Sequence, residues 1–260
     1  MSNSSFAASS NYKGPTQMSR YSKKRKFGPT PKSKYSTPLY AKAQSLLNQR
    51  TVGYIGLETK FIDYSKGATA LDWRLSHANH SPTTQGCLNA IATGDGSSNR
   101  DGRKCNLQSL HINGCLLFPE VLANTSTKSQ ARLLIVVDTQ TNKQQVTNLG
   151  EILHNSTNAN EEGNHIYLFR ELASTKRFKI LYDKTYVLNP NSKDNAMQKN
   201  FKINIQLKGM PVNYDNGVSS NGHVNTIYDN AIYVFALSDG SNTDVMKVFL
   251  EYVSRVRFTG

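Results

Sequence analysis

The sequence predicts an all-β fold: an eight-stranded antiparallel jelly-roll sandwich with a disordered basic N-terminal arm and one short helix in a loop. Three observations lead to it. After Thr51 most apolar segments alternate with a period of two, as half-buried strands do. Long loops rather than regular helices join these segments, which argues against a parallel α/β sheet. Eight strands in about 210 residues fit a jelly roll.

The cations of the chain are concentrated at its beginning. Residues 1–50 contain ten Lys and Arg and no acid, whereas the rest of the chain carries 21 cations against 18 acids. The same fifty residues are rich in Ser, Lys, Pro, Gly and Tyr and poor in Ile, Val and Leu. Such a segment cannot bury enough apolar surface to offset its ordering entropy. We therefore expect a basic, largely disordered arm over residues 1–50 and a nearly neutral folded domain over residues 51–260.

The arm has the residue types that bind single-stranded nucleic acid. Cations on a flexible chain neutralise phosphates, and aromatic rings between them stack on unpaired bases, worth ~1–3 kcal/mol per base. The expected contacts are Lys13, Arg20, Tyr21, Lys23, Lys24, Arg25, Lys26, Phe27, Lys32, Lys34 and Tyr35. The cluster Lys23–Lys26 also fits a nuclear import signal, which would make an import receptor a partner. A solvated tail without a specific role is the alternative interpretation.

Five segments of the domain alternate apolar with polar residues and are predicted as half-buried strands. The first is expected to turn Ile55, Leu57, Thr59 and Phe61 inward, with Gly56, Glu58 and Lys60 opposite. The inward residues of the other four are Leu110, Ile112, Leu116 and Phe118; Phe178, Ile180 and Tyr182; Phe201, Ile203, Ile205 and Leu207; and Val248, Leu250, Tyr252, Val256 and Phe258.

Two further segments, Leu133–Val137 and Ala231–Leu237, are continuous apolar runs, so we expect strands covered on both faces. An eighth strand is expected near Gly86–Ile91, ahead of a stretch rich in turn residues. The one short helix is expected to follow Asn148 as its cap. Leu149 and Ile152 would then point inward, and Glu151 would take the capping-box position.

Several classes of protein are excluded by composition. The longest apolar run has seven residues, Ala231–Leu237, whereas a membrane-spanning helix needs ~20. The first ten residues lack the apolar block of a secretory signal. Cys87, Cys105 and Cys115 are widely spaced and form no Cys-x-x-Cys pair. They predict part-buried thiols in a reducing compartment rather than a disulfide framework or a zinc ribbon.

No motif for catalysis or for a metal is present. The sequence contains no Gly-x-Ser-x-Gly elbow, no Walker loop and no His-Glu-x-x-His, so we predict that the protein is not an enzyme and assign no catalytic residue. His77 and His80 with Cys87 are interpreted as loop residues and not as zinc ligands. Four carboxylates near strand ends are expected to be solvated rather than bound to calcium: Asp63, Asp138, Asp183 and Asp239.

Several segments match, in order, those of one protein family. The run Leu88–Lys104, followed by Ser109–Gly114, resembles a signature stretch of small single-jelly-roll capsid proteins. Leu149–Leu153, Lys176–Thr185, Pro211–Gly217 and Asn230–Asp239 continue the match. Together they resemble the coat proteins of circular single-stranded DNA viruses that encode a replication initiator, namely geminivirus- and circovirus-like capsids. They also resemble the related coat of satellite tobacco necrosis virus.

This resemblance implies a capsid subunit that self-assembles into a small icosahedral T=1 shell of about 60 copies. The arms would point inward, bring roughly 600 positive charges, and package single-stranded circular DNA. The implied partners are copies of the chain, that DNA and nuclear import receptors, without membrane insertion. The implied locations are the virion and, during assembly, the host nucleus and cytoplasm.

Two points stay open at this stage. No cofactor is predicted; bridging calcium between subunits is compatible with the resemblance, but the sequence supplies no ligand set for it. The alternative to a capsid subunit is a cellular β-sandwich nucleic-acid-binding protein with a basic tail, working as a monomer or trimer.

Overall fold

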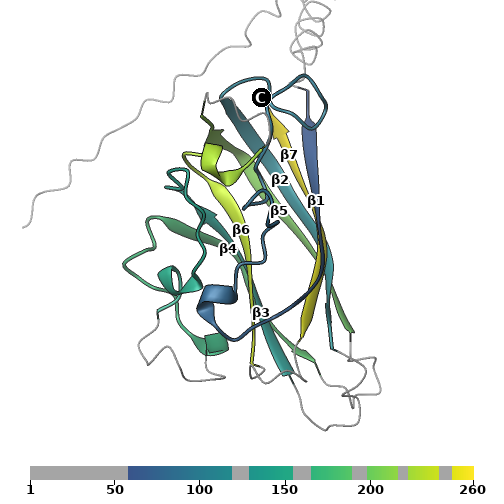
Figure 1. Cartoon of the computed structure of the whole chain (residues 1–260), viewed down its shortest axis with the longest axis vertical. Helices are drawn as coiled ribbons and strands as arrows, with labels where there is room; N and C mark the ends of the chain where they lie inside the picture. The colour runs from purple at the N-terminus through teal and green to yellow at the C-terminus, as the bar shows by residue number, and fades with distance from the viewer. Residues whose placement is uncertain (1–57, 119–128, 155–164, 189–197, 216–221, 240–247) are drawn as a thin grey trace, which may run out of the picture. The chain divides into compact units, whose positions relative to one another are not determined.

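The computed structural model describes residues 58–118, 129–154, 165–188, 198–215, 222–239 and 248–260. They form two antiparallel sheets packed face to face as a β-sandwich (Figure 1). The four-stranded sheet has the order β1 (Lys60–Ala70), β7 (Phe249–Thr259), β2 (Lys104–Leu117) and β5 (Gln198–Asn213). The three-stranded sheet has the order β4 (Phe178–Leu188), β3 (Ser129–Asp138) and β6 (Ala231–Ser238).

The connections between these strands follow a jelly roll. The chain passes from one sheet to the other between β2 and β3, between β4 and β5, and again on each side of β6. Neighbours within a sheet are therefore mostly far apart in the sequence, and every pairing is antiparallel. The predicted fold class, an all-β antiparallel sandwich, is confirmed.

Most of the predicted inward faces are buried in the core between the sheets. Leu110, Ile112, Leu116 and Phe118 are at most 4% exposed, and all of β3 and β6 is buried except the partly exposed Gln130. Phe201, Ile203 and Leu207 of β5 and the five predicted residues of the C-terminal segment are buried as well. Ile180, Tyr182 and Ile205 are partly buried against the same core. Strict alternation therefore located these faces correctly.

The predicted face of the first strand is wrong by one residue. Lys60 is 5% exposed and Phe61 is 40% exposed, the reverse of the expectation. The ammonium of Lys60 reaches Asp101 over 2.6 Å, so the lysine stem is buried while its charge is paired. The Phe61 ring instead packs against the guanidinium of Arg255 at 4.4 Å. Thr59 is exposed, and Ile55 and Leu57 lie outside the described residues.

The predicted eighth strand is not formed. Residues 86–91 are turns and irregular backbone within the segment 71–103 that joins β1 to β2. Gly86 has a φ of +81°, which an extended strand does not allow. The segment nevertheless covers the free edge of β6, through backbone hydrogen bonds of 2.8 Å that join Ala78 to Ala236, His80 to Val234, and Leu88 to Ile232. This edge is thereby closed without a regular strand.

The predicted helix is a single 3-10 turn, η3 (Leu149–Glu151). Asn148 caps it, because its side-chain oxygen accepts a hydrogen bond from the Gly150 backbone N–H at 2.7 Å. Leu149 and Ile152 are fully buried, as predicted. Glu151 does not complete a capping box and instead lies 3.3 Å from Nη1 of Arg177. The other helical segments among the described residues are also three-residue 3-10 turns: η1 (Leu75–His77), η4 (His165–Tyr167) and η5 (Val224–Thr226).

None of the helices in the described part of the chain is long and apolar enough to cross a membrane.

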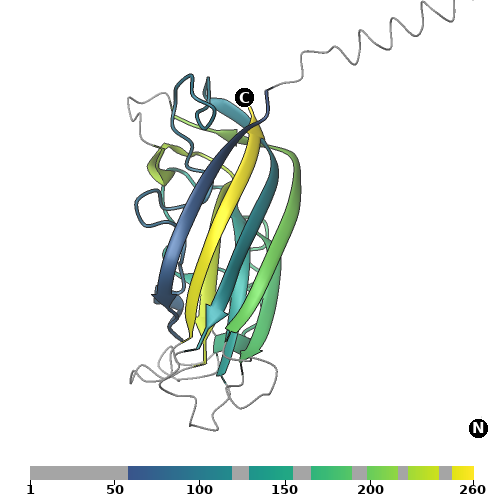
Figure 2. The ribbon, with the colours of Figure 1, turned by 90° about the vertical axis from the view of Figure 1, so that its right-hand side faces the viewer.

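The two sheets differ in what lies over their outer faces. Strands β3 and β6 are buried on both faces, because residues 139–154 and 165–177 pack over the outside of their sheet. Arg132 of β3, for example, donates hydrogen bonds to the carbonyl oxygens of Ile166 and Leu168 at 2.9 and 2.7 Å. In the four-stranded sheet, whose strands β1, β7, β2 and β5 lie side by side in Figure 2, buried and exposed residues alternate instead. Its outer face is bare of other described segments.

Candidate functional site

The predicted arm lies outside the described residues. This holds for every residue expected to contact nucleic acid, and for the cluster Lys23–Lys26 expected to act in nuclear import. Their roles therefore remain predictions: Lys13, Arg20, Tyr21, Lys23, Lys24, Arg25, Lys26, Phe27, Lys32, Lys34 and Tyr35. The described domain contributes two surfaces with unusual chemistry, the outer face of the four-stranded sheet and an apolar loop.

Strand register arranges the outer face of the four-stranded sheet in three rows of mostly polar side chains, with Phe61 and Val253 as the apolar members. The central row runs Asp63, Arg255, His111 and Asn204 across β1, β7, β2 and β5. The rows on either side are Phe61, Arg257, Ser109 and Gln206, and Ser65, Val253, Asn113 and Lys202. Their inward neighbours, such as Ile112 and Val256, belong to the core. The same alternation that builds the core therefore builds this polar face.

Hydrogen bonds join the strands across the central row. Arg255 holds Asp63 with two bonds, from Nε to Oδ1 at 2.7 Å and from Nη2 to Oδ2 at 2.5 Å. These bonds to the guanidinium are the main cause that lowers the pKa of the Asp63 carboxyl. His111 lies 2.7 Å from Asn204 Oδ1 through Nδ1 and 3.1 Å from Ser109 Oγ through Nε2. These hydrogen bonds hold the side chains of the central row in defined positions on the sheet.

Two open hollows lie on this face and share His111 and Arg257. One measures about 360 Å³ and also has Lys202, Asn113 and Asn204 in its wall. The other measures about 570 Å³ and is lined by Gln108, Gln206 and Lys208 among others. Lys202, Lys208 and Arg257 are exposed, and none of them forms an ion pair with another described residue.

The apolar loop, residues 165–177, carries three large side chains into solvent. Tyr167, Phe169 and Leu172 are 61%, 85% and 80% exposed. The backbone below them is firmly held: the His154 N–H donates to the Phe169 carbonyl at 2.7 Å, and the Glu171 N–H donates to the Ile152 carbonyl at 2.8 Å. Exposed apolar groups on a fixed support mark an interaction surface. Sequence patterning did not indicate this loop, since burial within a connecting segment depends on the tertiary fold.

The start of the same loop is anchored in the interior. The imidazole of His165 stacks on the ring of Trp73, with centroids 5.3 Å apart and planes at 4°. Its Nδ1 also lies 3.0 Å from the Trp73 carbonyl oxygen. At the other end, the guanidinium of Arg170 donates to the Phe178 carbonyl oxygen. These contacts fix the loop on both sides of Phe169.

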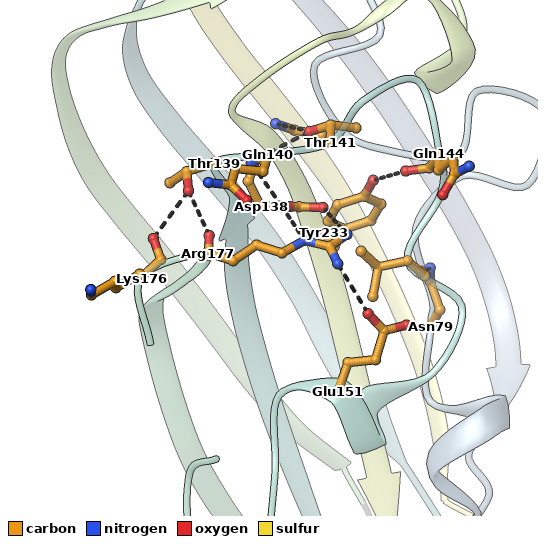
Figure 3. A network of polar contacts seen from close by, with 12 residues as sticks. Asn79, Asp138, Thr139, Gln140, Thr141, Gln144, Glu151, Lys176, Arg177 and Tyr233 are labelled. Atoms are coloured by element: carbon orange, nitrogen blue, oxygen red, sulfur yellow. Dashed lines mark hydrogen bonds and ion pairs between the residues drawn. The ribbon is translucent and has the colours of Figure 1, made fainter. Parts of the chain in front are cut away.

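The expectation that the strand-end carboxylates are solvated is wrong for Asp138, whose side chain is 0% exposed. Arg177 binds both of its oxygens, Nε to Oδ1 at 3.0 Å and Nη2 to Oδ2 at 2.9 Å. Figure 3 shows the Arg177 side chain reaching between Asp138 and Glu151. The backbone N–H of Gln140 gives Asp138 Oδ1 a further bond at 3.0 Å. The Asp138 carboxylate therefore joins the last residue of β3 to the segments that follow β3 and precede β4.

The other carboxylates of that set also accept bonds from their own chain. Asp183 binds Arg132 with two bonds of 2.8 and 2.6 Å. Asp239 Oδ1 accepts from the Ser129 hydroxyl and from the Gln130 backbone N–H at 2.7 and 2.8 Å. Within the described residues no three His, Cys, Asp or Glu side chains gather as a metal site would require. The structure therefore assigns these carboxylates to holding strands together.

Two residues of the weak zinc pattern, His80 and Cys87, are buried, whereas His77 is exposed. Burial lowers the pKa of His80 to about 4 and raises the pKa of the Cys87 thiol to about 12. A metal would need the thiolate, which this burial disfavours. Cys105 is buried too, with its pKa raised to about 11, and Cys115 is partly exposed. All three cysteines are free, as expected from their spacing.

Comparison with known proteins identifies no family for this chain. No family model matches the chain, and no curated protein matches it. Among solved structures, a chain of the Kashmir bee virus empty particle at acidic pH is similar over 96% of this chain and 84% of that chain. The two are 8% identical with a TM-score of 0.21. At these values the likeness is too slight to bear on fold or function.

Proposed function

We propose that the protein is a viral capsid subunit that self-assembles into a small closed shell and packages single-stranded nucleic acid. The observation that carries this proposal is the separation of charge along the chain. Ten cations without an acid occupy residues 1–50, and a nearly neutral jelly-roll sandwich follows. This combination suits a subunit whose domain contacts copies of itself while its arm binds the cargo.

Electrostatics explains why the two tasks need separate parts of the chain. Subunits with a large net charge would repel one another on packing, whereas a domain with 21 cations and 18 acids does not oppose close contact. The ten arm cations can instead neutralise phosphates by releasing counterions, whatever the base sequence. Nucleic acid then offsets the repulsion between arms gathered inside a shell.

The apolar loop supports self-assembly. Tyr167, Phe169 and Leu172 are large apolar side chains exposed within six residues of one loop, and such side chains are enriched at the centre of protein interfaces. The occupant that fits best is a second copy of the chain, because a capsid subunit must contact its own kind on several sides. Closed symmetric assemblies of identical subunits arise from repeated contacts of this type.

The finer features of the proposal rest on the resemblance found in the sequence. They are a T=1 shell of about 60 subunits, a circular DNA cargo, and import into the nucleus through Lys23–Lys26. The protein would then be located in the virion and, during assembly, in the host nucleus and cytoplasm.

The proposal is tested by comparing the full chain with a variant lacking residues 1–50. Circular dichroism should show the same β-rich fold for both, since both sheets and the hydrophobic core between them are built from residues after position 57. Negative-stain microscopy and the 260/280 nm absorbance ratio should show nucleic acid in particles of the full chain and a strong reduction in the variant. Equal nucleic-acid content in both, or a full chain that stays a small oligomer, would contradict the proposal and favour a cellular binding protein.

A further inference from the structure

The two hollows on the outer face of the four-stranded sheet are bordered by three cations without an ion-pair partner among the described residues. Arg257 of β7 lines both hollows, Lys202 of β5 lines one, and Lys208 of β5 lines the other. All three side chains are exposed, and each lines a hollow that His111 also lines, so they lie on the same side of the sheet as His111. Because the hollows share residues, the cations border one continuous surface rather than separate sites.

The charge of this face is positive on balance. Its other ionised residues are Lys104, Arg255, Asp63 and Glu251. Arg255 and Asp63 neutralise each other through two short hydrogen bonds. Glu251 is then the one acid of the described outer face that forms no ion pair with another described residue. Four cations without an ion pair among the described residues, Lys104 included, against one such acid favour a polyanion over an acidic or neutral protein surface.

The remaining side chains of the face can contact bases. Gln108, Asn113, Asn204 and Gln206 offer amide donors and acceptors. The ring of Phe61 is 40% exposed beside Arg255. Sheets that bind single-stranded nucleic acid combine cations, amides and aromatic rings in this way, so that phosphates and unpaired bases are both contacted. Two other anionic ligands fit this face less well. Binding of a free phosphate would not use the amide side chains, and binding of a lipid surface would require apolar side chains around the cations.

We propose that this outer face is a second binding surface for single-stranded nucleic acid, with Lys202, Lys208 and Arg257 contacting phosphates. The inference rests on the proposed function, since it takes the same cargo, but it assigns the contact to the folded domain and to residues remote in sequence from the arm. The arm supplies sequence-independent attraction, and the sheet supplies a fixed surface on which the strand lies.

The test is a triple variant of the full chain, Lys202→Gln, Lys208→Asn and Arg257→Gln. Asparagine is chosen at position 208 because Lys208 has a φ of +53°, which asparagine tolerates well. The matched control is Lys176→Gln, Lys179→Gln and Lys184→Gln, which removes the same charge from exposed positions on or next to β4 in the other sheet. Both variants keep the arm intact.

The readout is the binding of a fluorescent single-stranded oligonucleotide over a range of salt concentrations. Each phosphate contact contributes about 0.7 to the slope of log K against log salt for single strands. The sheet variant should therefore lose about 2 from the slope, and on the order of 10- to 100-fold in affinity at 0.1 M salt, while the control changes far less. Equal behaviour of the two variants would overturn the inference and leave the proposed function standing. A wild-type chain that does not bind the oligonucleotide would overturn both.

A second measurement is independent of whether the variant folds. Photo-crosslinking of the wild-type chain to a bromouracil oligonucleotide, followed by mass spectrometry, should yield adducts on peptides from β5 and β7 as well as on residues 1–50. Adducts confined to residues 1–50 would overturn the inference.

Discussion

The two sheets of the sandwich carry the same kind of ion pair at very different depths. In the three-stranded sheet, Asp138 is 0% exposed where it binds Arg177. In the four-stranded sheet, Asp63 and Arg255 are 39% and 44% exposed. Each carboxylate accepts two hydrogen bonds from its arginine, so the number of bonds does not explain the difference in exposure. The difference arises because residues 139–154 and 165–177 pack over the three-stranded sheet, whereas no described segment packs over the four-stranded sheet. The covered sheet isolates its ion pair from water, and the bare sheet leaves its ion pair in contact with water.

The largest effect is expected from the apolar loop over the covered sheet. Replacing Phe169→Ser and Leu172→Ser together should abolish particle formation, because these two exposed side chains supply much of the apolar surface available to a second copy. The stability of the subunit should change by no more than about 0.5 kcal/mol, since neither side chain is buried. Light scattering measures the first effect and urea unfolding measures the second.

Val253→Ser is the matched control for that experiment. Val253 is 53% exposed but lies on the bare sheet. It should assemble normally. Particles of normal size from the double variant would show that the loop is not a subunit contact.

The second-largest effect is expected from the substitution Asp138→Asn, which should lower the stability of the subunit. Loss of the charge leaves the Arg177 guanidinium beside a neutral amide in a partly buried position. Removing one partner of a buried pair typically costs 3–5 kcal/mol, and the 34% exposure of Arg177 lowers the expectation to about 2–4 kcal/mol. A denaturant titration of Asp138→Asn and of the wild-type chain measures this loss as the difference between their free energies of unfolding. A loss below about 1 kcal/mol would show that the covering segments do not isolate this pair from water.

A similar loss is expected on acidification, through His80 at the edge of the covered sheet. Burial is the main cause that lowers its pKa from 6.5 to about 4, and the charge of Lys66 acts in the same direction. The unfolded chain therefore binds the proton more tightly, so the stability present above pH 6.5 is lost as the pH falls toward 4. At pH 5 the loss should be roughly 2 kcal/mol relative to pH 8.

His80→Gln should remove this part of the pH dependence. Unfolding titrations of both proteins at pH 8 and pH 5 give the comparison. An unchanged difference between the two pH values would assign the acid sensitivity to other groups.

The smallest effect is expected from Asp63→Asn on the bare sheet. Exposed ion pairs contribute about 0–1 kcal/mol, so this change should cost less than about 1 kcal/mol in the titration used for Asp138→Asn. Since Arg255 then becomes an unpaired cation on the outer face, oligonucleotide binding should strengthen slightly. A stability loss equal to that of Asp138→Asn would remove the distinction between the sheets.

Strand identity and core faces were predictable because they depend on local alternation. Leu110, Ile112 and Leu116 show this, and so does the continuous run of β6, which is buried on both faces as its sequence indicates. The cap at Asn148 was also found from the sequence, because its bond to Gly150 spans only two residues. In each case the interactions that decide the structure lie within a few positions.

Features set by distant partners were not predictable. Lys60 is buried because Asp101, 41 residues away, pairs with it. The segment around Asn89 replaces a strand because its side chain bonds the backbone of Ile232 across 143 residues. The polar rows of the outer face require the pairing of β1, β7, β2 and β5, which alternation alone does not specify. The exposure of Phe169 likewise depends on how its loop is anchored.

The most direct test is to purify the full chain and measure the particle mass by light scattering together with the nucleic acid that survives nuclease treatment. A capsid subunit should give uniform closed particles with a protected single-stranded cargo. A monomer or trimer that leaves all bound nucleic acid open to nuclease would contradict the proposal.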